Sequence, residues 1–285
     1  ARLRKRKQRD ERPLALMCRD TTEAEQYVSI TEDEKKALES FRKPIVLLNK
    51  KNPDYHSFLS ENNYIGIMLP YTPLHCLLLE KTGTLVMTSA NLSDKPIIYR
   101  NEEALTELKG IADAFLLHDR EIETRCDDSL LWVREGKDYP VRRSRGFVPY
   151  PVRLEFETTL QGILACGAEQ KASFALTKGN MVFPSQHIGD LKNWETFSHY
   201  EEQIRHFERL FDVHPSVLAC DLHPDYLSTR YAQERAEREG IPLVRVQHHH
   251  AHMASCMADN ALSGLCIGLV WDGTGLGTDG TSWGA

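Results

Sequence analysis

A short apolar run leads directly into a cluster of histidines in Pro242-Leu-Val-Arg-Val-Gln-His-His-His-Ala-His252. The run at 242–246 predicts a strand, and the histidines predict the first turn of a helix. In such a helix His248 and His252 are four residues apart and share one face, with their imidazoles close enough to bind one metal ion. The segment predicts a strand–helix unit of an α/β domain with a metal site at the junction.

Two histidines do not fill the coordination sphere of a metal ion. A zincin protease needs a glutamate directly after the first histidine, and His249 occupies that position, which disfavours a metalloprotease. We therefore expect a carboxylate and a water or substrate molecule to complete the site. Asp272, after a predicted strand at 266–271, is the candidate. The predicted metal ligands are His248, His252 and Asp272, and the expected ion is zinc or iron, although manganese tolerates the same ligands.

Two glycine-containing turns follow strand-like runs in the second half of the chain. Asp272 opens the turn Asp-Gly-Thr-Gly-Leu-Gly277, in which Gly273 and Gly275 allow backbone N–H groups to approach phosphate oxygens. In Ala165-Cys-Gly-Ala-Glu-Gln-Lys171, Gly167 permits a turn and Lys171 follows as a candidate phosphate ligand. Each turn alone also fits a plain hairpin. Paired turns of this kind hold a nucleotide in actin-like ATPases, and Lys171 and Asp272 are the predicted catalytic residues.

The composition bounds the class of protein. With 285 residues, of which 41% are hydrophobic, the chain is long enough for two domains with separate cores. The net charge of −6 disfavours a general nucleic-acid binder and favours small anions or another protein as partners. No apolar run is long enough for a membrane span, and the start lacks the pattern of a signal peptide. Scattered cysteines without C-x-x-C spacing indicate a reducing cytoplasm.

The runs of apolar residues outline the elements of two α/β domains. Strands are expected in the first half at 13–18, 44–48, 64–69, 85–88, 114–118 and 129–133. The second half predicts a hairpin within 162–177, helices at 194–211 and 225–239, and strands at 217–220, 242–246 and 266–271. The closely spaced Pro149 and Pro151 favour an extended link and a domain boundary near residue 155. The predicted domains are 1–155 and 156–285, and the chain is expected to be a fragment of a longer protein.

Basic and hydroxyl-bearing residues gather at two places in the first half. Arg4, Lys5 and Arg6 belong to a basic run in the first twelve positions, for which a solvated tail is the usual explanation. A polar segment after the strand at 85–88 offers hydroxyl and amide groups that suit a small planar polar group or a phosphate, although an ordinary loop has the same composition. Its candidates are Thr88, Ser89, Asn91 and Ser93.

A second basic cluster, Arg142-Arg-Ser-Arg-Gly146, supplies Arg143 and Arg145 as candidate bidentate donors to phosphate. Asp127 and Asp128 precede it along the chain. These carboxylates either hold a magnesium ion or pair with the arginines, and the sequence leaves both interpretations open.

Several of these motifs resemble one family in their order along the chain. The segments Ser185-Gln-His-Ile-Gly-Asp-Leu191, Cys220-Asp-Leu-His-Pro-Asp-Tyr226 and Val246-Gln-His-His-His-Ala-His252 are similar to the Kae1-like domain of HypF, the carbamoyltransferases of hydrogenase maturation. The first half resembles the YrdC-like domain of that family through Tyr64-Ile-Gly-Ile-Met-Leu-Pro-Tyr-Thr-Pro-Leu-His75, Met87-Thr-Ser-Ala-Asn-Leu-Ser93, Arg125-Cys-Asp-Asp-Ser129 and Arg142-Arg-Ser-Arg-Gly146. The resemblance implies a YrdC-like twisted α/β domain followed by an incomplete actin-like (ASKHA, Kae1-like) α/β lobe.

The resemblance also implies a reaction. HypF proteins adenylate carbamate, derived from carbamoyl phosphate, with ATP and Mg²⁺, and pass the carbamoyl group to the C-terminal cysteine thiol of HypE. The basic run would then neutralise the ATP triphosphate, and the histidine pair with Asp272 would form the metal and active site. The family's acylphosphatase-like and cysteine-rich zinc modules and the second lobe of its Kae1-like domain have no counterpart in these 285 residues. We therefore expect this fragment to be inactive in the overall transfer.

Two other functions remain as alternatives at the level of sequence. YrdC-like and Kae1-like domains also occur in threonylcarbamoyl transfer to tRNA, where the adenylate chemistry is the same and the acceptor is a nucleic acid. A non-catalytic RNA-binding module is suggested by the basic first twelve residues, but the acidic overall charge disfavours RNA as a partner.

Overall fold

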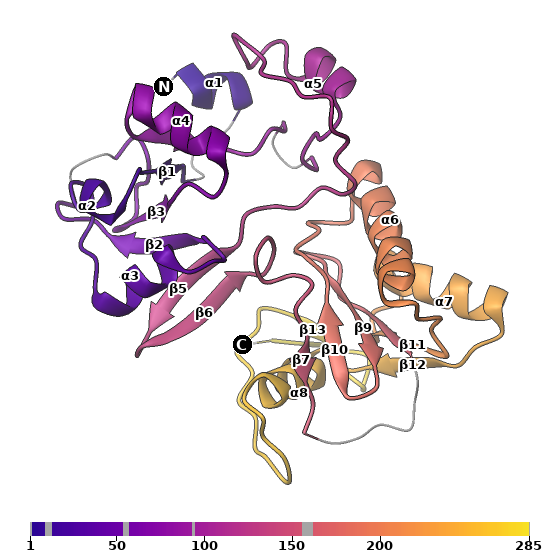
Figure 1. Cartoon of the computed structure of the whole chain (residues 1–285). Helices are drawn as coiled ribbons and strands as arrows, with labels where there is room; N and C mark the ends of the chain where they lie inside the picture. Colours follow the sequence, from indigo (N-terminus) through magenta and orange to yellow (C-terminus); the bar gives the residue numbers. More distant parts are fainter. Residues whose placement is uncertain (1, 9–12, 54–56, 93–94, 156–161, 285) are drawn as a thin grey trace. The chain divides into compact units, whose positions relative to one another are not determined.

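A computed structural model of the chain describes residues 2–8, 13–53, 57–92, 95–155 and 162–284. The chain divides into two compact units, Ala1–Phe147 and Val148–Ala285. In Figure 1 the colours follow the sequence, so each unit can be found by its colours. The strand β7 (Val152–Arg153) already pairs with a strand of the second unit. The domain limits of 1–155 and 156–285 remain a prediction.

A six-stranded mixed sheet forms the first unit, in the order β4-β1-β3-β2-β5-β6. Its strands are β1 (Ala15–Met17), β2 (Ile45–Asn49), β3 (Tyr64–Met68), β4 (Leu85–Met87), β5 (Leu130–Arg134) and β6 (Lys137–Arg142). β1 runs parallel to β3 and β2 parallel to β5, whereas the other neighbours are antiparallel. The strands predicted around residues 13–18, 44–48, 64–69, 85–88 and 129–133 are confirmed.

Several helices of the first unit begin at side chains that cap their free N–H groups. The helices are α1 (Arg2–Lys7), α2 (Thr21–Ala24), α3 (Glu32–Glu39), α4 (Pro73–Thr82) and α5 (Asn101–Glu107). Thr31 and Glu34 form a capping box at the start of α3. The Thr72 hydroxyl accepts the N–H of His75 at the start of α4, where Pro73 occupies the first turn. These caps fix where α3 and α4 start relative to the sheet.

The second unit is built on another six-stranded sheet, in the order β12-β11-β8-β9-β10-β7. Its remaining strands are β8 (Ile163–Cys166), β9 (Phe174–Lys178), β10 (Met181–Pro184), β11 (Val217–Asp221) and β12 (Leu243–Val246). β8, β11 and β12 are parallel neighbours, and β8, β9 and β10 form an antiparallel meander. A small separate ladder joins β13 (Gly275–Leu276) to β14 (Ser282–Trp283).

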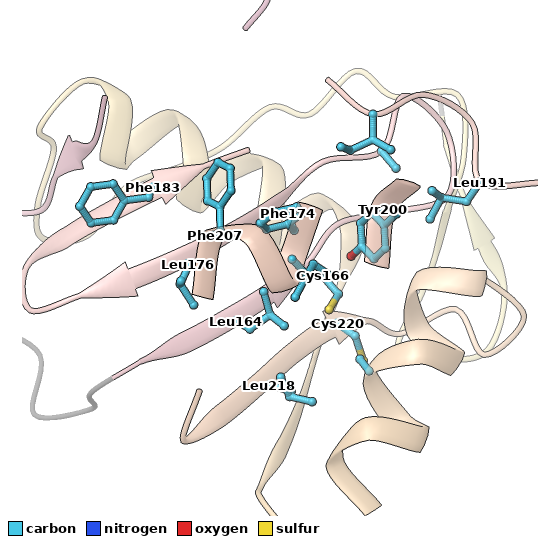
Figure 2. Close-up of a cluster of buried hydrophobic side chains, with 14 of the residues drawn as sticks. Leu164, Cys166, Phe174, Leu176, Phe183, Leu191, Tyr200, Phe207, Leu218 and Cys220 are labelled. Atoms are coloured by element: carbon cyan, nitrogen blue, oxygen red, sulfur yellow. The ribbon is translucent and has the colours of Figure 1, made fainter. Parts of the chain in front are cut away.

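The helix α6 (Trp194–Phe211) supplies much of the core of the second unit. Its bounds are those predicted from apolar residues at intervals of three and four. Tyr200 and Phe207 are buried and make edge-on ring contacts with Phe174 of β9, as Figure 2 shows. Burial of such an aromatic side chain contributes about 1.5–3 kcal/mol. The apolar face of α6 thus packs into the core of the second unit, except at Trp194, which is 73% exposed.

Parallel strands bring their carboxyl ends to one edge of the sheet, and that edge carries the histidines. β11 ends at Asp221, and β12, beside it, ends at Val246 just before α8 (His248–Asp259). The helix α7 (Leu227–Glu239) connects the two strands. Asp221 and His248 therefore meet although the chain between them forms a whole helix and a strand.

Two predicted strands are wrong. Residues 114–118 pair with no strand of the described chain, and Leu116 and Leu117 are exposed. Residues 266–271 also lack a ladder, and Ile267, Leu269 and Trp271 are more than four-fifths exposed. An apolar run becomes a strand only when a neighbour supplies hydrogen bonds, and neither run has one among the described residues. Among all the residues that the structure describes, no helix is both long and apolar enough to cross a membrane.

Candidate functional site

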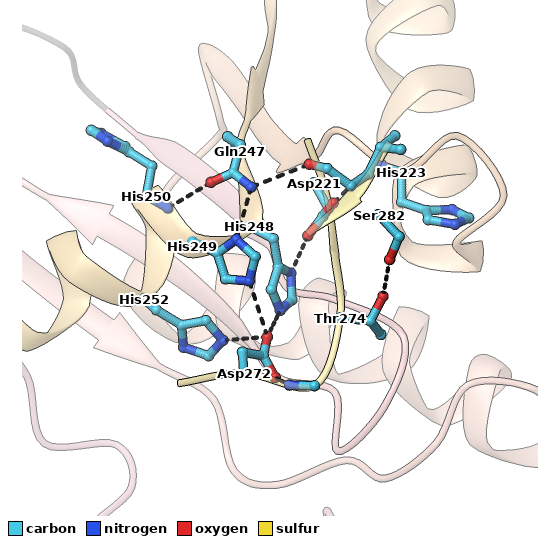
Figure 3. A network of polar contacts seen from close by, with 12 residues as sticks. Asp221, His223, Gln247, His248, His249, His250, His252, Asp272, Thr274 and Ser282 are labelled. Atoms are coloured by element: carbon cyan, nitrogen blue, oxygen red, sulfur yellow. Dashed lines mark hydrogen bonds and ion pairs between the residues drawn. The ribbon is translucent and has the colours of Figure 1, made fainter. Parts of the chain in front are cut away.

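Three side chains predicted as metal ligands converge at the start of α8. His248 Nε2 lies 2.9 Å and His252 Nε2 3.4 Å from Asp272 Oδ2. One candidate ligand atom from each residue lies within 4.8 Å of the others. Figure 3 shows both imidazoles directed at the Asp272 carboxylate. The helical spacing of the histidines and the turn after Trp271 thus produce one cluster from two separate segments.

Gln247 and Gly275 hold the Asp272 loop against the helix. The Gln247 side chain caps α8 by accepting the His250 N–H at 2.9 Å, and its amide also donates to Leu276 O at 3.2 Å. A Cβ at Gly275 would stand 2.9 Å from His248 Cβ, which is too close for any other residue. The glycine that was predicted to approach a phosphate therefore permits close contact between this loop and the histidine helix.

The surroundings of Asp272 Oδ2 fit a metal ion. This atom is buried and accepts no hydrogen bond of normal geometry from the described residues, although three imidazole Nε2 atoms, including that of His249 at 3.9 Å, surround it. A buried oxygen without a donor is costly. Ligands about 2.1 Å from a tetrahedral ion lie about 3.4 Å apart, and the observed spacings bracket that value. The donor set of two imidazoles and a carboxylate suits a divalent transition metal.

The charge state of Asp272 supports the same assignment. Burial acts to raise the pKa of this carboxyl group, but the Gly273 N–H and then the charges of His248, His252 and His249 outweigh it, so that the pKa is lowered. The Gly273 N–H donates to Oδ1 at 2.8 Å. Asp272 is consequently a carboxylate near neutral pH, which is the form that binds metals.

Asp221 belongs to this cluster and was missed from the sequence. Its Oδ2 lies 2.6 Å from His248 Nδ1, on the opposite side of the ring from Asp272. The Asp221 side chain is only 7% exposed. One signal in the sequence could have identified it. Asp221 directly follows the predicted strand at 217–220, just as the histidines follow the predicted strand at 242–246.

The other predicted residues of the second unit lie on the turn between β8 and β9 or near Asp272. The Gly167 N–H donates to Ser173 O at 3.1 Å, and a Cβ there would meet that oxygen. Lys171 is exposed with φ of 49°, and its N–H donates to Asp190 at 2.7 Å. Gly273 has open space around it. The nucleotide or catalytic roles of these residues stay predictions.

In the first unit the polar loop after β4 gathers around a lysine at the end of α1. Lys7 is 2% exposed, and its Nζ donates to Thr88 Oγ1 at 2.9 Å, Ser89 O at 2.6 Å and Asn91 Oδ1 at 3.2 Å. The sequence placed Lys7 in the basic run but did not single it out, because only the fold distinguishes it from its neighbours. Ser93 lies outside the described residues.

The remaining basic candidates of α1 contact protein groups or solvent. Arg4 donates to Phe58 O and Leu59 O, and Arg6 pairs with Asp113 at 2.9 Å, while Lys5 is exposed. These contacts show that α1 packs on the unit through part of its basic surface. The nucleotide-binding roles of Arg4, Lys5 and Arg6 stay predictions.

The second basic cluster is tied down in the same way. The three nitrogens of the Arg145 guanidinium donate to Asp128, Arg42 O and Lys43 O, and Arg143 donates to Phe147 O. Asp127 lies 3.7 Å from Arg142. Each aspartate thus pairs with an arginine, and the magnesium interpretation stays a prediction. The phosphate-binding roles of Arg143 and Arg145 stay predictions.

Two family models and several curated proteins match the chain. The HypF Kae1-like domain model matches residues 158–259, and the Sua5/YciO/YrdC model, described as telomere recombination, matches residues 1–144. Carbamoyltransferase HypF2 of Cupriavidus necator is 42% identical over 307 residues, which cover 100% of this chain and 38% of that protein. The chain belongs to the HypF family. Carbamoyltransferase HypF of Synechocystis sp. is 41% identical over 99% of this chain and 37% of its own length.

Solved HypF structures agree with the family assignment. The crystal structure of full-length HypF in its phosphate- and nucleotide-bound form has a TM-score of 0.93 and 46% identity, covering 99% of this chain and 44% of that chain. The T. kodakarensis HypF structure has a TM-score of 0.91 and 40% identity, covering 99% of this chain and 37% of that one. The predicted fold, a YrdC-like domain followed by part of a Kae1-like one, is confirmed. This HypF-family chain spans less than half the length of the relatives that it matches.

Proposed function

We propose that this HypF-family chain takes part in ATP-dependent carbamoyl transfer during hydrogenase maturation. Carbamate derived from carbamoyl phosphate attacks the α-phosphorus of ATP and pyrophosphate leaves; a thiolate at the C-terminus of HypE then attacks the carbamoyl carbon and AMP leaves. The relatives named carbamoyltransferases, 42% and 41% identical across this chain, support the assignment. The observation that carries it is the cluster of His248, His252 and Asp272 at the edge of the second sheet.

The first unit is suited to the adenylation half of the reaction. The buried Lys7 ammonium lies beside the hydroxyl of Thr88 and the amide of Asn91. A positive charge held among hydroxyl and amide groups stabilises the charge that develops on phosphate oxygens when pyrophosphate leaves. We propose that ATP, with Mg²⁺, binds at this cluster.

The second unit is suited to the transfer half. His248, His252 and Asp272 would hold a zinc or iron ion, which when bound supplies Lewis-acid polarisation of the carbamoyl carbonyl or orientation of the nucleotide. The ionised Asp272 and the Gly273 N–H that fixes it keep the carboxylate aimed at the imidazoles. The expected setting for this chemistry is the cytoplasm.

An exchange assay on the full-length enzyme tests the adenylation half. ATP–pyrophosphate exchange is expected with carbamoyl phosphate and not with threonine and bicarbonate, which is the substrate pair of the tRNA alternative. Lys7→Met should lower the exchange rate on the order of 100-fold, because the buried ammonium is lost. Lys36→Met is the control, since Lys36 is exposed on α3 and pairs only with Asp33 among the contacts described.

Each outcome decides between the functions. Exchange driven by threonine and bicarbonate would support threonylcarbamoyl transfer instead. Salt-dependent RNA binding without any exchange would support the binding module. Exchange that is unchanged in Lys7→Met would remove the proposed ATP site from the Lys7 cluster.

A further inference from the structure

We propose that Asp221 is a positioning residue that fixes the tautomer and orientation of His248, so that Nε2 of this imidazole is presented for metal binding. The proposal deepens the metal site described under Proposed function and rests on it. Asp221 contacts neither Asp272 nor His252 in the described contacts, so its effect on the site passes through His248 alone.

The geometry pins the Asp221 carboxylate on both oxygens. Oδ2 lies 2.6 Å from His248 Nδ1, and Oδ1 accepts the His223 N–H at 2.9 Å. The residue ends β11, and its side chain is 7% exposed. A short contact made by a buried carboxylate that cannot rotate freely is a directional constraint on its partner.

The chemistry of the two groups decides where the imidazole proton lies. An ionised carboxylate only accepts hydrogen bonds, so the His248 nitrogen that faces Asp221 must carry the proton. When a metal ion is bound the ring is neutral, and the other nitrogen, Nε2, which faces Asp272 at 2.9 Å, offers its lone pair to the ion. Metal-binding histidines commonly donate their second N–H to a carboxylate, which fixes the ring and raises its basicity as a ligand.

The two histidine ligands differ in this respect. The His248 side chain is 16% exposed and held from behind by Asp221, whereas that of His252 is 54% exposed. The described contacts of His252 Nε2 lead only to Asp272, and its ring packs against His248 at 4.8 Å between centroids. His248 is therefore oriented before a metal ion binds, whereas His252 takes its final orientation on binding. Most of the preorganisation of the histidine ligands consequently depends on Asp221.

Metal affinity of the full-length enzyme tests the proposal. Cobalt(II) binding to metal-free protein is followed through its visible absorption bands, and zinc(II) binding is measured by competition. Asp221→Asn keeps the shape of the side chain and an oxygen acceptor for the His223 N–H. It is expected to weaken binding about 10- to 100-fold, the usual effect of losing such a carboxylate. Asp225→Asn is the matched control, because Asp225 lies in the loop that follows Asp221 but is 71% exposed and pairs with Arg230.

A spectroscopic readout separates positioning from a general loss of structure. In zinc-loaded wild type, ¹H–¹⁵N NMR of the imidazoles should show His248 with its proton on Nδ1 and protected from exchange by Asp221, and in Asp221→Asn this proton should exchange faster. Equal metal affinity in wild type and Asp221→Asn, or a zinc-loaded wild type with the His248 proton on Nε2, would overturn the proposal while leaving the metal site intact. Failure of wild type to bind either ion would overturn both this proposal and the metal centre on which it rests.

Discussion

His248 lies between two carboxylates that come from different parts of the chain. Asp221 faces its Nδ1 at 2.6 Å, and Asp272 faces its Nε2 at 2.9 Å. The pair of histidines and Asp272 could be predicted from sequence, because helical spacing and a carboxylate after an apolar run are local patterns. Asp221 could not be selected in the same way, since its contact depends on two parallel strands lying side by side.

Lys7 illustrates the same limit in the first unit. It is one of several basic residues in the first twelve positions, and nothing in that run ranks it above Arg4, Lys5 or Arg6. Only the fold buries its ammonium beside the loop at Thr88. Burial and long-range partners are tertiary properties, which is why the polar loop could be predicted and its central lysine could not.

Gly275 leads to a residue-scale prediction about how the metal centre is assembled. Gly275→Ala should weaken metal affinity on the order of tenfold or more, because the new Cβ would lie 2.9 Å from His248 Cβ and push the Asp272 loop away. Gly273→Ala should keep the affinity for metal, since a Cβ there meets nothing within 4 Å. Zinc competition titrations of the two variants check this. Equal affinities would mean that the loop is not held by this close approach.

Cys18 leads to a residue-scale prediction about pH. Burial, partly offset by the Thr84 hydroxyl, raises the pKa of this thiol from 9.0 to about 11. Because the folded pKa is the higher one, the contribution to stability is fully present below 9.0 and is lost as the pH rises toward 11. At about pH 8 iodoacetamide should label the exposed Cys76 and leave Cys18 unlabelled until the protein unfolds. Mass spectrometry of the peptides checks this, and rapid labelling of native Cys18 would contradict it.

At the scale of elements, hydrophobic periodicity predicted a helix or strand correctly where the apolar run packs against a neighbouring element. The helix at 194–211 matches α6 because its apolar face covers a sheet. The runs at 114–118 and 266–271 have the composition of strands but no described neighbour to bond them, so the prediction failed there. The strands β7 and β10 were not predicted as separate elements, because β7 has only two residues and β10 ends in a proline, which argues against a strand.

The packing of α6 against α7 yields an element-scale prediction. Arg235 of α7 is 8% exposed and pairs with Glu208 of α6 at 2.6 Å and with Glu239 at 2.9 Å. Arg235→Ala should lower the free energy of unfolding by roughly 2–4 kcal/mol, because two carboxylates lose their buried partner. Arg238→Ala, which removes an arginine that is 67% exposed, should cost less than about 1 kcal/mol.

Urea denaturation combined with hydrogen exchange of the α6 and α7 peptides checks the prediction and localises the loss of stability to the second unit. Equal stabilities of the Arg235→Ala and Arg238→Ala variants would show that the ion pairs between the helices contribute little.

At the scale of the whole molecule, each unit carries a candidate site whose polar side chains its own fold brings together. The Lys7 cluster lies in the unit Ala1–Phe147, and the His248 cluster in the unit Val148–Ala285. The order of motifs along the chain was sufficient to predict the family and the α/β class of both units. That order did not predict which residues contact one another within each cluster, because these contacts depend on strand order in the sheet rather than on sequence spacing.

The central claim is that the Lys7 cluster serves adenylation and the His248 cluster serves carbamoyl transfer. The most direct measurement is the transfer of isotope-labelled carbamoyl from carbamoyl phosphate to the HypE thiol by the full-length enzyme. The double variant His248→Ala, His252→Ala should lose transfer on the order of 100-fold or more while ATP–pyrophosphate exchange continues. His250→Ala should transfer normally, because His250 lies on the same helix with its side chain directed away from Asp272 (Figure 3). Transfer at the wild-type rate by the double variant would contradict the claim.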